Sequence, residues 1–594
     1  MKALLDWFDH RTGARKLLHE ALFENIPGGA RWRYVWGSML TFAFSVQVIT
    51  GLLLWTSYNP SSTTAWESVY YIQHELWGGW FLRGVHHYTA QFMTLLLVLH
   101  LMQVVIDGAY KAPREMNFWF GLILFKLVLA LSLTGYLLPW DQKGFWATKV
   151  ATNIAGITPV IGPSLQKLII GGTDYGHQTL SRFFALHAGI LPLLIGLLIV
   201  GHIYLFRRHG ITAKQPLRKR DAAFWPDQVL KDGVACLALM AAVLFLVIRT
   251  RGGELGAPAD PTEPFSAARP EWYFLFLFQL LKYFPGTTEI IGAIILPGLA
   301  ATVVFLMPFI ARWRLGHTFN VCFLFMLLGI AGLLTGLALR QDGRDPLFLA
   351  SEKDAEAQAQ RVVELAQSPT GIPPTGAVNL LRNDPLTQGP KIFAKNCASC
   401  HRYGGHDGLG HEPTDPPSAP DLKGIGTRAW ISGFLDPQKI VSSNYFGGSR
   451  HKDGKMAGFV QKKVSQYSNE QRDQLTKVIA ALSAEANLES QKELDARESG
   501  LIEDGRKWLR SELGCTDCHQ FRVKDEDATA PDLTGYGSKD WLVRFISNPA
   551  HPDFYGKKND RMPRYADDGV LTEAQISMVA DWLRGEWFRP LAER

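Results

Sequence analysis

The sequence predicts a mostly α-helical protein, with a seven-helix membrane bundle followed by two small helical domains in tandem. Three observations lead to this prediction. Seven apolar runs, each of the length that spans a bilayer, occupy the chain up to about Leu339. Four histidines recur inside two of these runs at matched intervals. The mixed, polar remainder contains two C-x-x-C-H motifs, each followed by a version of the same short stretch.

The composition excludes several classes of protein. A chain of 594 residues is too long for one soluble core, so several domains are expected. The net charge of +6 is modest, and the basic residues lie beside apolar runs rather than in a separate patch. We therefore expect contact with membrane lipids and no nucleic-acid partner. The amphipathic start, MKALLDWFDHRTGARK, lacks the apolar core of a cleavable signal peptide.

The predicted spans alternate with clusters of basic residues on one side. The spans are 33–56, 80–106, 117–138, 179–206, 232–249, 288–311 and 318–339. The basic residues lie before span one and after spans two, four and six: Arg11, Arg15, Lys16, Arg31, Arg33, Lys111, Arg114, Arg207, Arg208, Lys214, Arg218, Lys219, Arg220, Arg312 and Arg314. Such residues mark the cytoplasmic side. We expect a bacterial inner-membrane protein with a cytoplasmic N-terminus and a periplasmic tail.

Helical geometry separates the two adjacent histidines of span two. His86 and His100 are fourteen residues apart, which places them within about 40° of each other and about 21 Å apart along the axis. His87 and His100 are thirteen apart and point to nearly opposite faces. The pattern therefore favours His86 over His87 as the functional partner of His100, and it predicts that His87 has only a structural role near the outer interface.

Span four repeats the arrangement with His187 and His202, fifteen residues apart. Two helices with two same-face histidines each predict two bis-histidine sites, one near each membrane surface. A bare metal ion would need further ligands, whereas haem needs only two axial ligands and brings its own four nitrogens. Spans one and three each carry two glycines fourteen residues apart, where a flat macrocycle lying against the helix would require a missing side chain: Gly37, Gly51, Gly121 and Gly135.

The two C-x-x-C-H motifs of the tail are the attachment signature of c-type haem. In each motif the two thiols bind the haem and the adjacent histidine becomes an axial ligand. The residues are Cys397, Cys400 and His401 in the first motif and Cys515, Cys518 and His519 in the second. Attachment of such haems outside the cytoplasm agrees with the orientation predicted from the basic residues.

An internal repeat follows the motifs. APDLKGIGTRAWISGFL, residues 419–435, matches APDLTGYGSKDWLVRFI, residues 530–546. Each copy continues to a methionine, Met456 or Met562, and the tail resembles two class I cytochrome c domains in tandem. That resemblance implies a late methionine as the sixth iron ligand, with His451 as an alternative to Met456 in the first copy.

Residues 1–340 resemble the cytochrome b family of quinol–cytochrome c oxidoreductases. The resemblance rests on the histidine and glycine intervals, on TGYLLPWDQKGFWATKV and on RPEWYFLFLFQLLKYF. It is similar to the b6f type, with its four-helix and three-helix subunits fused. The resemblance implies an outer haem b on His86 and His187 and an inner one on His100 and His202. The expected domains are 1–215, 216–340, a linker at 341–387, and cytochrome c domains at 388–490 and 491–594.

The sequence departs from the family in places. Val35 stands where the photosynthetic type carries a cysteine, so we expect no additional covalent haem. Gln103 stands where many relatives have a basic residue, so we expect Lys111, Arg114 or Arg207 to neutralise the inner propionates. Arg83 would serve the outer propionates.

The family also implies a quinol site at the outer surface. Glu271 precedes span six in an apolar, aromatic stretch, where a carboxylate has a raised pKa and accepts protons near neutral pH. The resemblance implies that Glu271 accepts a quinol proton with Tyr273 beside it. We expect LLPWDQKGFW to form the opposite wall as a short amphipathic element.

The implied activity is quinol oxidation coupled to proton translocation. One electron would pass to a separate Rieske iron–sulfur subunit and the other across the two b haems, while the two c haems export electrons to a cytochrome c or a terminal oxidase. The family is also dimeric. Two alternatives remain: a membrane electron conduit between the quinone pool and another redox enzyme, and net flow in the reverse direction. The Pro-Glu-Trp-Tyr segment and Trp140-Asp141-Gln142 argue against a bare conduit.

Overall fold

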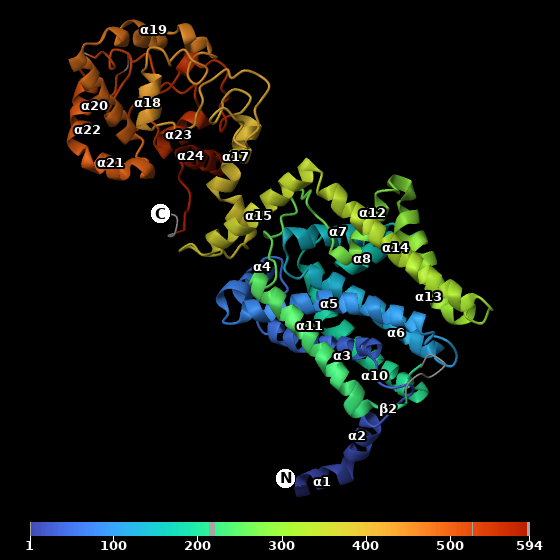
Figure 1. Ribbon diagram of the computed structural model, residues 1–594. Coiled ribbons are helices and arrows are strands. Elements are labelled where there is room, and N and C mark those ends of the chain that lie inside the picture. Colours follow the sequence, from blue (N-terminus) through green and yellow to red (C-terminus); the bar gives the residue numbers. More distant parts are fainter. Residues whose placement is uncertain (1, 213–219, 512, 526, 591–594) are drawn as a thin grey trace. The chain divides into compact units, whose positions relative to one another are not determined.

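The computed structural model describes residues 2–212, 220–511, 513–525 and 527–590, and the chain divides into two compact units. The first comprises residues 1–363 and 372–378, and the second comprises 364–371 and 379–594 (Figure 1). Three of the basic residues used to orient the membrane bundle lie outside the described residues: Lys214, Arg218 and Lys219.

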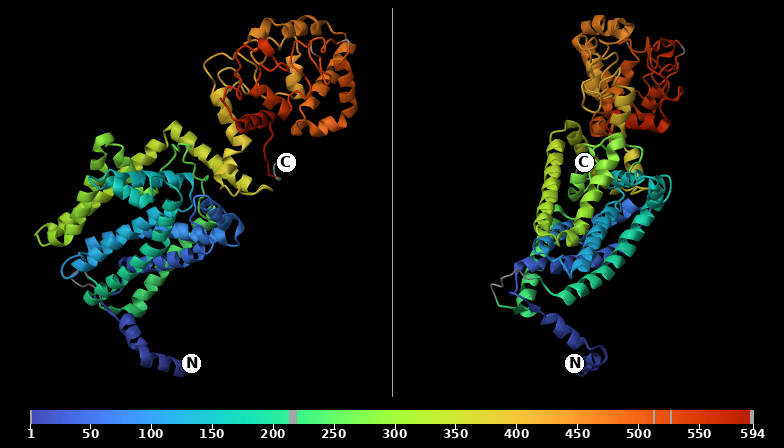
Figure 2. Two further views of the ribbon diagram at one scale, coloured as in Figure 1. Left: turned by 180° about the vertical axis from the view of Figure 1, so that it is seen from behind. Right: turned by 90° about the vertical axis from the view of Figure 1, so that its right-hand side faces the viewer.

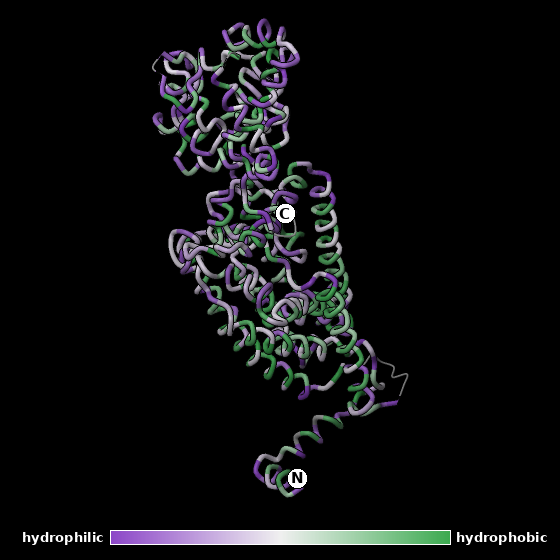
Figure 3. Tube along the Cα trace, turned by 90° about the vertical axis from the view of Figure 1, so that its left-hand side faces the viewer, coloured by the Kyte–Doolittle hydropathy of each residue, from purple (hydrophilic) through white to green (hydrophobic). Residues whose placement is uncertain are grey.

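All seven predicted spans are confirmed. Among the described residues, seven helical segments are long and apolar enough to cross a membrane: Trp32–Trp55, Gly79–Ile106, Glu115–Tyr136, His177–His209, Phe224–Thr250, Gly286–Ile310 and Gly316–Asp342. The fifth begins earlier than predicted, because the chain kinks at Trp225 and its first turn lies before the long apolar run. Figure 3 shows that apolar residues are concentrated along these helices, whereas apolar and polar residues alternate throughout the second unit.

The helices of the first unit include short segments that connect the spans. The bounds are α1 (Lys2–Thr12), α2 (Ala14–Leu22), α3 (Val35–Trp55), α4 (Ala65–Tyr70), α5 (Gly79–Ile106), α6 (Glu115–Tyr136), α7 (Gln142–Gly156), α8 (Gly162–Ile170), α9 (His177–Phe184), α10 (Leu191–His209), α11 (Val229–Thr250), α12 (Leu275–Leu281), α13 (Leu296–Ile310), α14 (Gly316–Asp342) and α15 (Pro346–Ala366). A π-helical turn, η3 (Ala185–Ile190), joins α9 to α10. Figure 2 shows α1 and α2 extending away from the bundle.

One apolar core holds the histidine-bearing helices together. Residues of α3, α5, α6 and α10 meet in it, and α11 adds Ala235, Leu239, Val243 and Val247. The part after residue 216 is therefore packed into the first four helices through α11. Gly84 of α5 sits directly against Val247, where an added Cβ would lie 2.8 Å from a Val247 methyl carbon.

Polar contacts tie the helix ends together on the side of His100 and His202. Arg33, before α3, forms an ion pair of 2.6 Å with Asp107, after α5. Arg114, at the start of α6, donates to the His209 carbonyl at the end of α10 at 2.7 Å. The short strands β1 (Asn25–Ile26) and β2 (Ala222–Ala223) pair antiparallel at the same end. Two of the predicted basic residues, Arg33 and Arg114, therefore bond to other helix ends of the bundle.

The second unit is wholly helical and loop-rich among its described residues. After α16 (Val378–Arg382), its helices are α17 (Pro385–Asn396), α18 (Arg428–Phe434), α19 (Lys455–Lys462), α20 (Asn469–Glu485), α21 (Lys492–Arg497), α22 (Ser499–Leu509), α23 (Lys539–Ser547) and α24 (Glu573–Arg584). Within the expected linker at 341–387, residues Pro346–Ala366 form the helix α15.

The helices of this unit pack across the expected boundary at residue 490. α17, which leads into the first C-x-x-C-H, packs against α24, and α22, which leads into the second, packs against α20. Glycines permit both close approaches: Gly389 faces Trp582, and a Cβ at Gly505 would meet Ala481 at 2.9 Å. The structure thus differs from two self-contained consecutive domains, because each core combines one half of each repeat.

Candidate functional site

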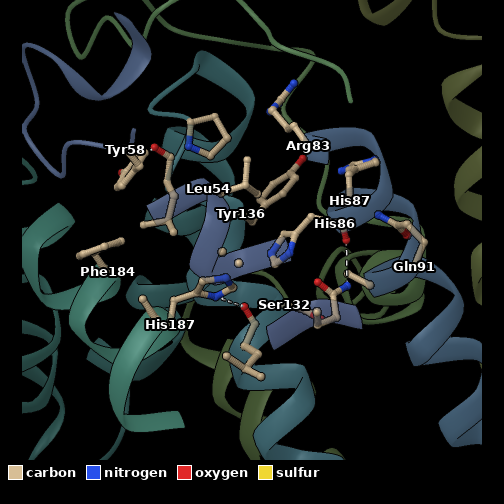
Figure 4. A pocket seen from close by; sticks show the side chains of 18 of the residues that line it. Leu54, Tyr58, Arg83, His86, His87, Gln91, Ser132, Tyr136, Phe184 and His187 are labelled. Carbon is tan, nitrogen blue, oxygen red and sulfur yellow. Dashed lines mark hydrogen bonds between the residues drawn. The ribbon is translucent and has the colours of Figure 1, made fainter. Parts of the chain in front are cut away.

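The four predicted histidines meet in two pairs. The rings of His86 and His187 have centroids 6.2 Å apart, and those of His100 and His202 are 6.5 Å apart. A metal–imidazole nitrogen bond is about 2 Å and the nitrogen lies about 1 Å from the ring centre, so two axial imidazoles on one iron have centroids about 6 Å apart. In Figure 4, His86 and His187 project toward each other. Both pairs fit a haem iron between them.

Hydrogen bonds at Nδ1 leave the other ring nitrogen free to bind iron. Nδ1 of His86 lies 2.9 Å from Thr50 Oγ1. Nδ1 of His187 lies 3.0 Å from the Leu131 carbonyl, and Nδ1 of His202 lies 3.1 Å from the Asn117 carbonyl. Carbonyl acceptors require a proton on Nδ1 and so direct the Nε2 lone pair toward the metal. This is the donor chemistry of an axial ligand.

The inner pair has unpartnered polar atoms at its edge. Within the described part of the chain, Nδ1 of His100, Nε of Arg114 and Oδ1 of Asn117 are buried without a hydrogen-bond partner. Buried polar groups normally have partners, so these suggest a missing group. A free N–H of Arg114 suits an anionic haem propionate, and the role of Arg114 at the inner haem stays a prediction.

Each of the four predicted glycines faces one histidine. An added Cβ would lie 3.8 Å from Cε1 of His100 at Gly37, 3.3 Å from that of His86 at Gly51, 3.3 Å from that of His202 at Gly121 and 2.5 Å from that of His187 at Gly135. We expected the glycines to make room for the flat macrocycle. In the structure they make room for the imidazoles, which approach α3 and α6 edge-on.

A cavity of about 320 Å³ connects the outer histidine pair to the predicted quinol residues. His86, His187, Gly51 and Gly135 line one part of it. The residues from the two motifs line another part: Tyr136, Leu138, Pro139, Asp141, Lys143, Glu271 and Tyr273. The structure thus brings the LLPWDQKGFW segment and the Pro-Glu-Trp-Tyr segment to one cavity.

Glu271 is held at this cavity by a residue that the motifs did not indicate. Gln91 of α5 donates to Glu271 Oε2 at 3.0 Å and accepts from the Trp272 indole at 2.7 Å. Burial raises the pKa of Glu271 against the opposing effects of Gln91 and Lys143. Burial likewise raises the pKa of Tyr273. A carboxyl with a raised pKa facing a cavity can exchange a proton near neutral pH.

Asp141, which lines the same cavity as Glu271, is held by backbone hydrogen bonds. Its carboxylate caps α7 by accepting from the Gly144 N–H at 2.8 Å, and it also accepts from the Gly256 N–H at 3.1 Å. Burial raises the pKa of Asp141, although both N–H groups oppose this. α7 is the short element expected after span three. Since the Asp141 carboxylate has structural bonds, it is weaker evidence for quinol chemistry than the sequence motif indicated.

Arg83 lines the cavity, but most of its guanidinium is engaged. It donates to Gln73 Oε1 at 2.9 Å, to the Gly253 carbonyl at 2.7 Å and to the Glu254 carbonyl at 2.5 Å. Arg83 therefore ties α5 to the loop after α11. Its role toward the outer propionates stays a prediction that uses the remaining N–H groups.

His87 faces elsewhere, as the helical geometry predicted. Its ring lies against Tyr88, with centroids 4.9 Å apart, and its Cβ lies beside Gly253. His87 also lines the same cavity as His86 and His187, which the expectation of a purely structural role did not include. Val35, where the photosynthetic type has a cysteine, begins α3 as a buried residue.

In the second unit, the histidine of each C-x-x-C-H motif also has its Nδ1 atom beside a backbone carbonyl. Nδ1 of His401 lies 2.7 Å from the Pro420 carbonyl, and Nδ1 of His519 lies 2.7 Å from the Pro531 carbonyl. Both carbonyls belong to the repeated APDL segment, so the repeat fixes the orientation of each proximal imidazole. The four motif cysteines are free thiols available to bind haem.

The two methionines lie in different cores. Met456 packs against the cluster that also contacts Cys515, and Met562 packs against the cluster that contacts Cys397. His451, the alternative ligand, stacks on Tyr555 of the other repeat, with centroids 5.5 Å apart.

Other important residues escaped sequence reasoning. Thr50 and Thr134, each next to a predicted glycine, contact Nδ1 of His86 and His187. A repeated Thr-Gly pair was the signal available for them. Gln91 gave a weaker signal, a lone amide in an apolar run. The bidentate pair of Arg269 with Asp342, at 2.8 and 2.7 Å, gave none, since its members are 73 residues apart.

Comparison with known proteins identifies families that match three parts of the chain. The family described as Cytochrome b/b6/petB matches residues 24–210, the family Cytochrome b(C-terminal)/b6/petD matches 258–346, and the family Cytochrome c matches 386–483. Cytochrome b of Rhodobacter capsulatus is 33% identical over 324 residues, which cover 50% of this chain and 73% of that protein.

Two further relatives point the same way. The menaquinol:cytochrome c reductase cytochrome b subunit of Geobacillus thermodenitrificans is 38% identical over 36% of this chain and 98% of its own length. A solved chain of a hyperthermophilic respiratory Complex III superposes with a TM-score of 0.50 at 26% identity, covering 60% of this chain and 95% of that one. With its paired histidines, seven spans and C-terminal cytochrome c region, the chain belongs to the cytochrome b family of bc-type quinol:cytochrome c oxidoreductase complexes.

Proposed function

We propose that this chain oxidises quinol at the outer cavity and sends the two electrons along different routes. The observation that carries the proposal is the shared cavity, which joins the His86–His187 pair to Glu271 and Tyr273. Haem bound between paired histidines supplies one-electron transfer. A quinol in this cavity would lie beside both an electron acceptor and a proton acceptor.

Residues of this chain would accept a proton from the quinol and hold its ring in position. Oxidation of a quinol releases two protons with its two electrons. Glu271, with a pKa raised by burial, takes a proton as carboxylate. Its bond to Gln91 orients the carboxylate at the cavity wall. The aromatic residues that line the same cavity offer a flat, apolar surface for a quinone ring.

The proposed routes require a partner and a membrane orientation. A separate Rieske subunit would accept one electron of each quinol. Haems held by the outer and inner histidine pairs would carry the other, so two quinols would supply the two electrons that reduce one quinone near the cytoplasm. Proton uptake inside and release outside conserve energy. The basic residues tied together at the His100–His202 end support a cytoplasmic location of that end, and hence a periplasmic tail. We expect the complex to be a homodimer in a bacterial inner membrane.

The tail is proposed to export electrons through two covalent haems to a cytochrome c or a terminal oxidase. The Nδ1 bonds of His401 and His519 support axial ligation at both motifs. The purified complex should contain two b haems, two c haems and a Rieske protein. Quinol oxidation by a complex without any Rieske protein would contradict the bifurcated route.

Glu271→Gln tests the outer site. The amide keeps the size of the side chain and the contact with Gln91 but cannot accept a proton as a carboxylate does. Turnover of quinol oxidation should fall by about 10²-fold or more, together with loss of sensitivity to an outer-site inhibitor, while the haem content stays unchanged. Glu263→Gln, in the same loop, is a matched control and should retain turnover. Unchanged turnover in Glu271→Gln would refute the assignment.

A further inference from the structure

We propose that each c haem is enclosed by both repeats of the tail, with the axial methionines exchanged. Met562 would complete the site of Cys397, Cys400 and His401, and Met456 would complete the site of Cys515, Cys518 and His519. This inference rests on the proposed attachment of haem at both motifs. It goes beyond that proposal by assigning the sixth ligand of each iron to the other repeat.

The first site is built from the two ends of the unit. Cys397 and Met562 pack against one buried cluster, to which α17 contributes Phe393 and α24 contributes Ile576 and Val579. The hydroxyl of Tyr565, three residues after Met562, donates to the Asn396 carbonyl at 2.7 Å. The segment that carries Met562 is therefore bonded directly to the residue that precedes Cys397.

The second site is built from the middle of the unit and repeats this arrangement. Cys515 and Met456 pack against a different cluster, to which α20 contributes Val478 and α22 contributes Leu509. The hydroxyl of Tyr467, which follows Met456, donates to the Leu513 carbonyl at 3.0 Å. In both sites, a tyrosine after the methionine donates a hydrogen bond to a backbone carbonyl. That carbonyl lies one or two residues before the first cysteine of the other repeat.

The chain crosses from one site to the other at two equivalent glycines. Gly426 ends APDLKGIG and Gly537 ends APDLTGYG, and both have positive φ angles, 81° and 74°. A Cβ on Gly537 would lie 3.3 Å from the Gly426 Cα, and a Cβ on Gly426 would lie 3.8 Å from the Gly537 Cα. The same added Cβ atoms would lie 3.0 Å (Gly426) and 3.2 Å (Gly537) from the Cβ of Ala486. The repeats thus touch at corresponding points, as expected where two copies of one fold exchange their second halves.

The exchange changes the order of parts along the chain. The described residues within 427–537 would form one site, in which the methionine precedes its C-x-x-C-H. The flanking segments 385–426 and 538–585 would form the other around it. Neither repeat alone can complete a histidine–methionine site. The pairing of α17 with α24 also requires the whole tail before the first site can close.

Ligand variants in single-haem backgrounds test the exchange in the full-length complex. Cys515→Ala with Cys518→Ala leaves only the first covalent haem. A ferric haem bound by methionine shows a near-infrared sulfur-to-iron band. In this background Met562→Ala should abolish the band and Met456→Ala should retain it. Cys397→Ala with Cys400→Ala should give the opposite result. Met578→Ala, a matched control in the first core, should keep the band in both backgrounds. A band that follows the methionine of the same repeat would overturn the proposal.

Cleavage of the chain provides a second measurement that needs no haem deletion. A protease site is inserted between Glu489 and Ser490, which are both exposed. Cleavage there breaks the peptide link between the two repeats. The fragment that begins at Ser490 should stay bound to the membrane part after native washing at high salt, and separate only on denaturation. Its release under native conditions would contradict the shared cores. Haem staining of the denatured fragments checks the underlying function: a missing stain on either fragment would refute covalent haem attachment at that motif, independently of the exchange.

Discussion

Replacement of Gly135 by alanine should remove the outer b haem. A Cβ at this position would lie 2.5 Å from Cε1, 3.0 Å from Nδ1 and 3.2 Å from Nε2 of His187. Nonbonded carbon atoms prefer about 3.5 to 4.0 Å, so the imidazole must move by about 1 Å. Because ligands must be held within about 0.5 Å of their productive position, we expect the iron to lose this ligand.

The other three glycines provide graded controls for this prediction. The corresponding distances to Cε1 are 3.3 Å at Gly51 and Gly121 and 3.8 Å at Gly37. Alanine is favoured over glycine in a helix interior by about 1 kcal/mol, so Gly37→Ala should be neutral or stabilising and keep both b haems. Gly51→Ala and Gly121→Ala should lower the affinity of one haem each, since their neighbours must shift by only a few tenths of an ångström.

The assay is a haem inventory of each purified variant with a redox titration of the b haems. Gly135→Ala should contain one b haem and two c haems, and its remaining b haem should titrate as the inner one. Thermal unfolding checks that the variant is otherwise folded. Retention of both b haems at unchanged potentials in Gly135→Ala would refute the steric argument, as would equal haem loss in Gly37→Ala.

Three further predictions concern the outer end of the bundle. His86→Ala should lose the outer b haem while His87→Ala keeps both, which optical spectra of the reduced complexes would establish; loss of a haem in His87→Ala would contradict the pairing of His86 with His187. The rate of quinol oxidation should rise with pH through a value above the usual pKa of a glutamate, because burial raises the pKa of Glu271 and only its carboxylate accepts the proton; a pH–rate profile with the same rise in Glu271→Gln would assign it to another group. Arg269→Lys loses one bond of the bidentate pair with Asp342, so the complex should unfold at lower temperature, by about 1 to 3 kcal/mol in free energy, with its haem content intact. Unchanged thermal stability would show that this pair contributes little.

The membrane part follows closely from the sequence because its determinants are local. Span length and apolar content define each helix without reference to the rest of the fold. The angle between His86 and His100 depends only on the turn of one helix. What the sequence lacks is information on contacts between helices. Gln91 meets Glu271 across 180 residues, and no pattern in either segment announces the contact.

The sequence indicated the four glycines beside the histidine pairs, but it did not indicate that they face the imidazole rings. Their interval of fourteen matches the spacing of the histidines, since both reflect two sites at two heights. The sequence cannot say whether such a glycine faces a cofactor or a neighbouring side chain. The structure shows that α3 approaches α5, and α6 approaches η3 and α10, through the ring edges of the histidines.

The tail shows why a repeat identifies modules without indicating how they close. The order of features in each copy is the same whether a copy closes on itself or on its neighbour, so the match of residues 386–483 to the cytochrome c family fits both arrangements. The lengths of chain between successive helices distinguish these two arrangements. α20 ends at Glu485 and α22 begins at Ser499, whereas α22 ends at Leu509 and α24 begins only at Glu573. Consecutive helices joined by short connections usually lie side by side, because closing a short loop costs less entropy. Pairing α20 with α22 satisfies that preference, and α17 is then left to pair with α24. The exchanged arrangement is therefore the one that the spacing of the helices favours.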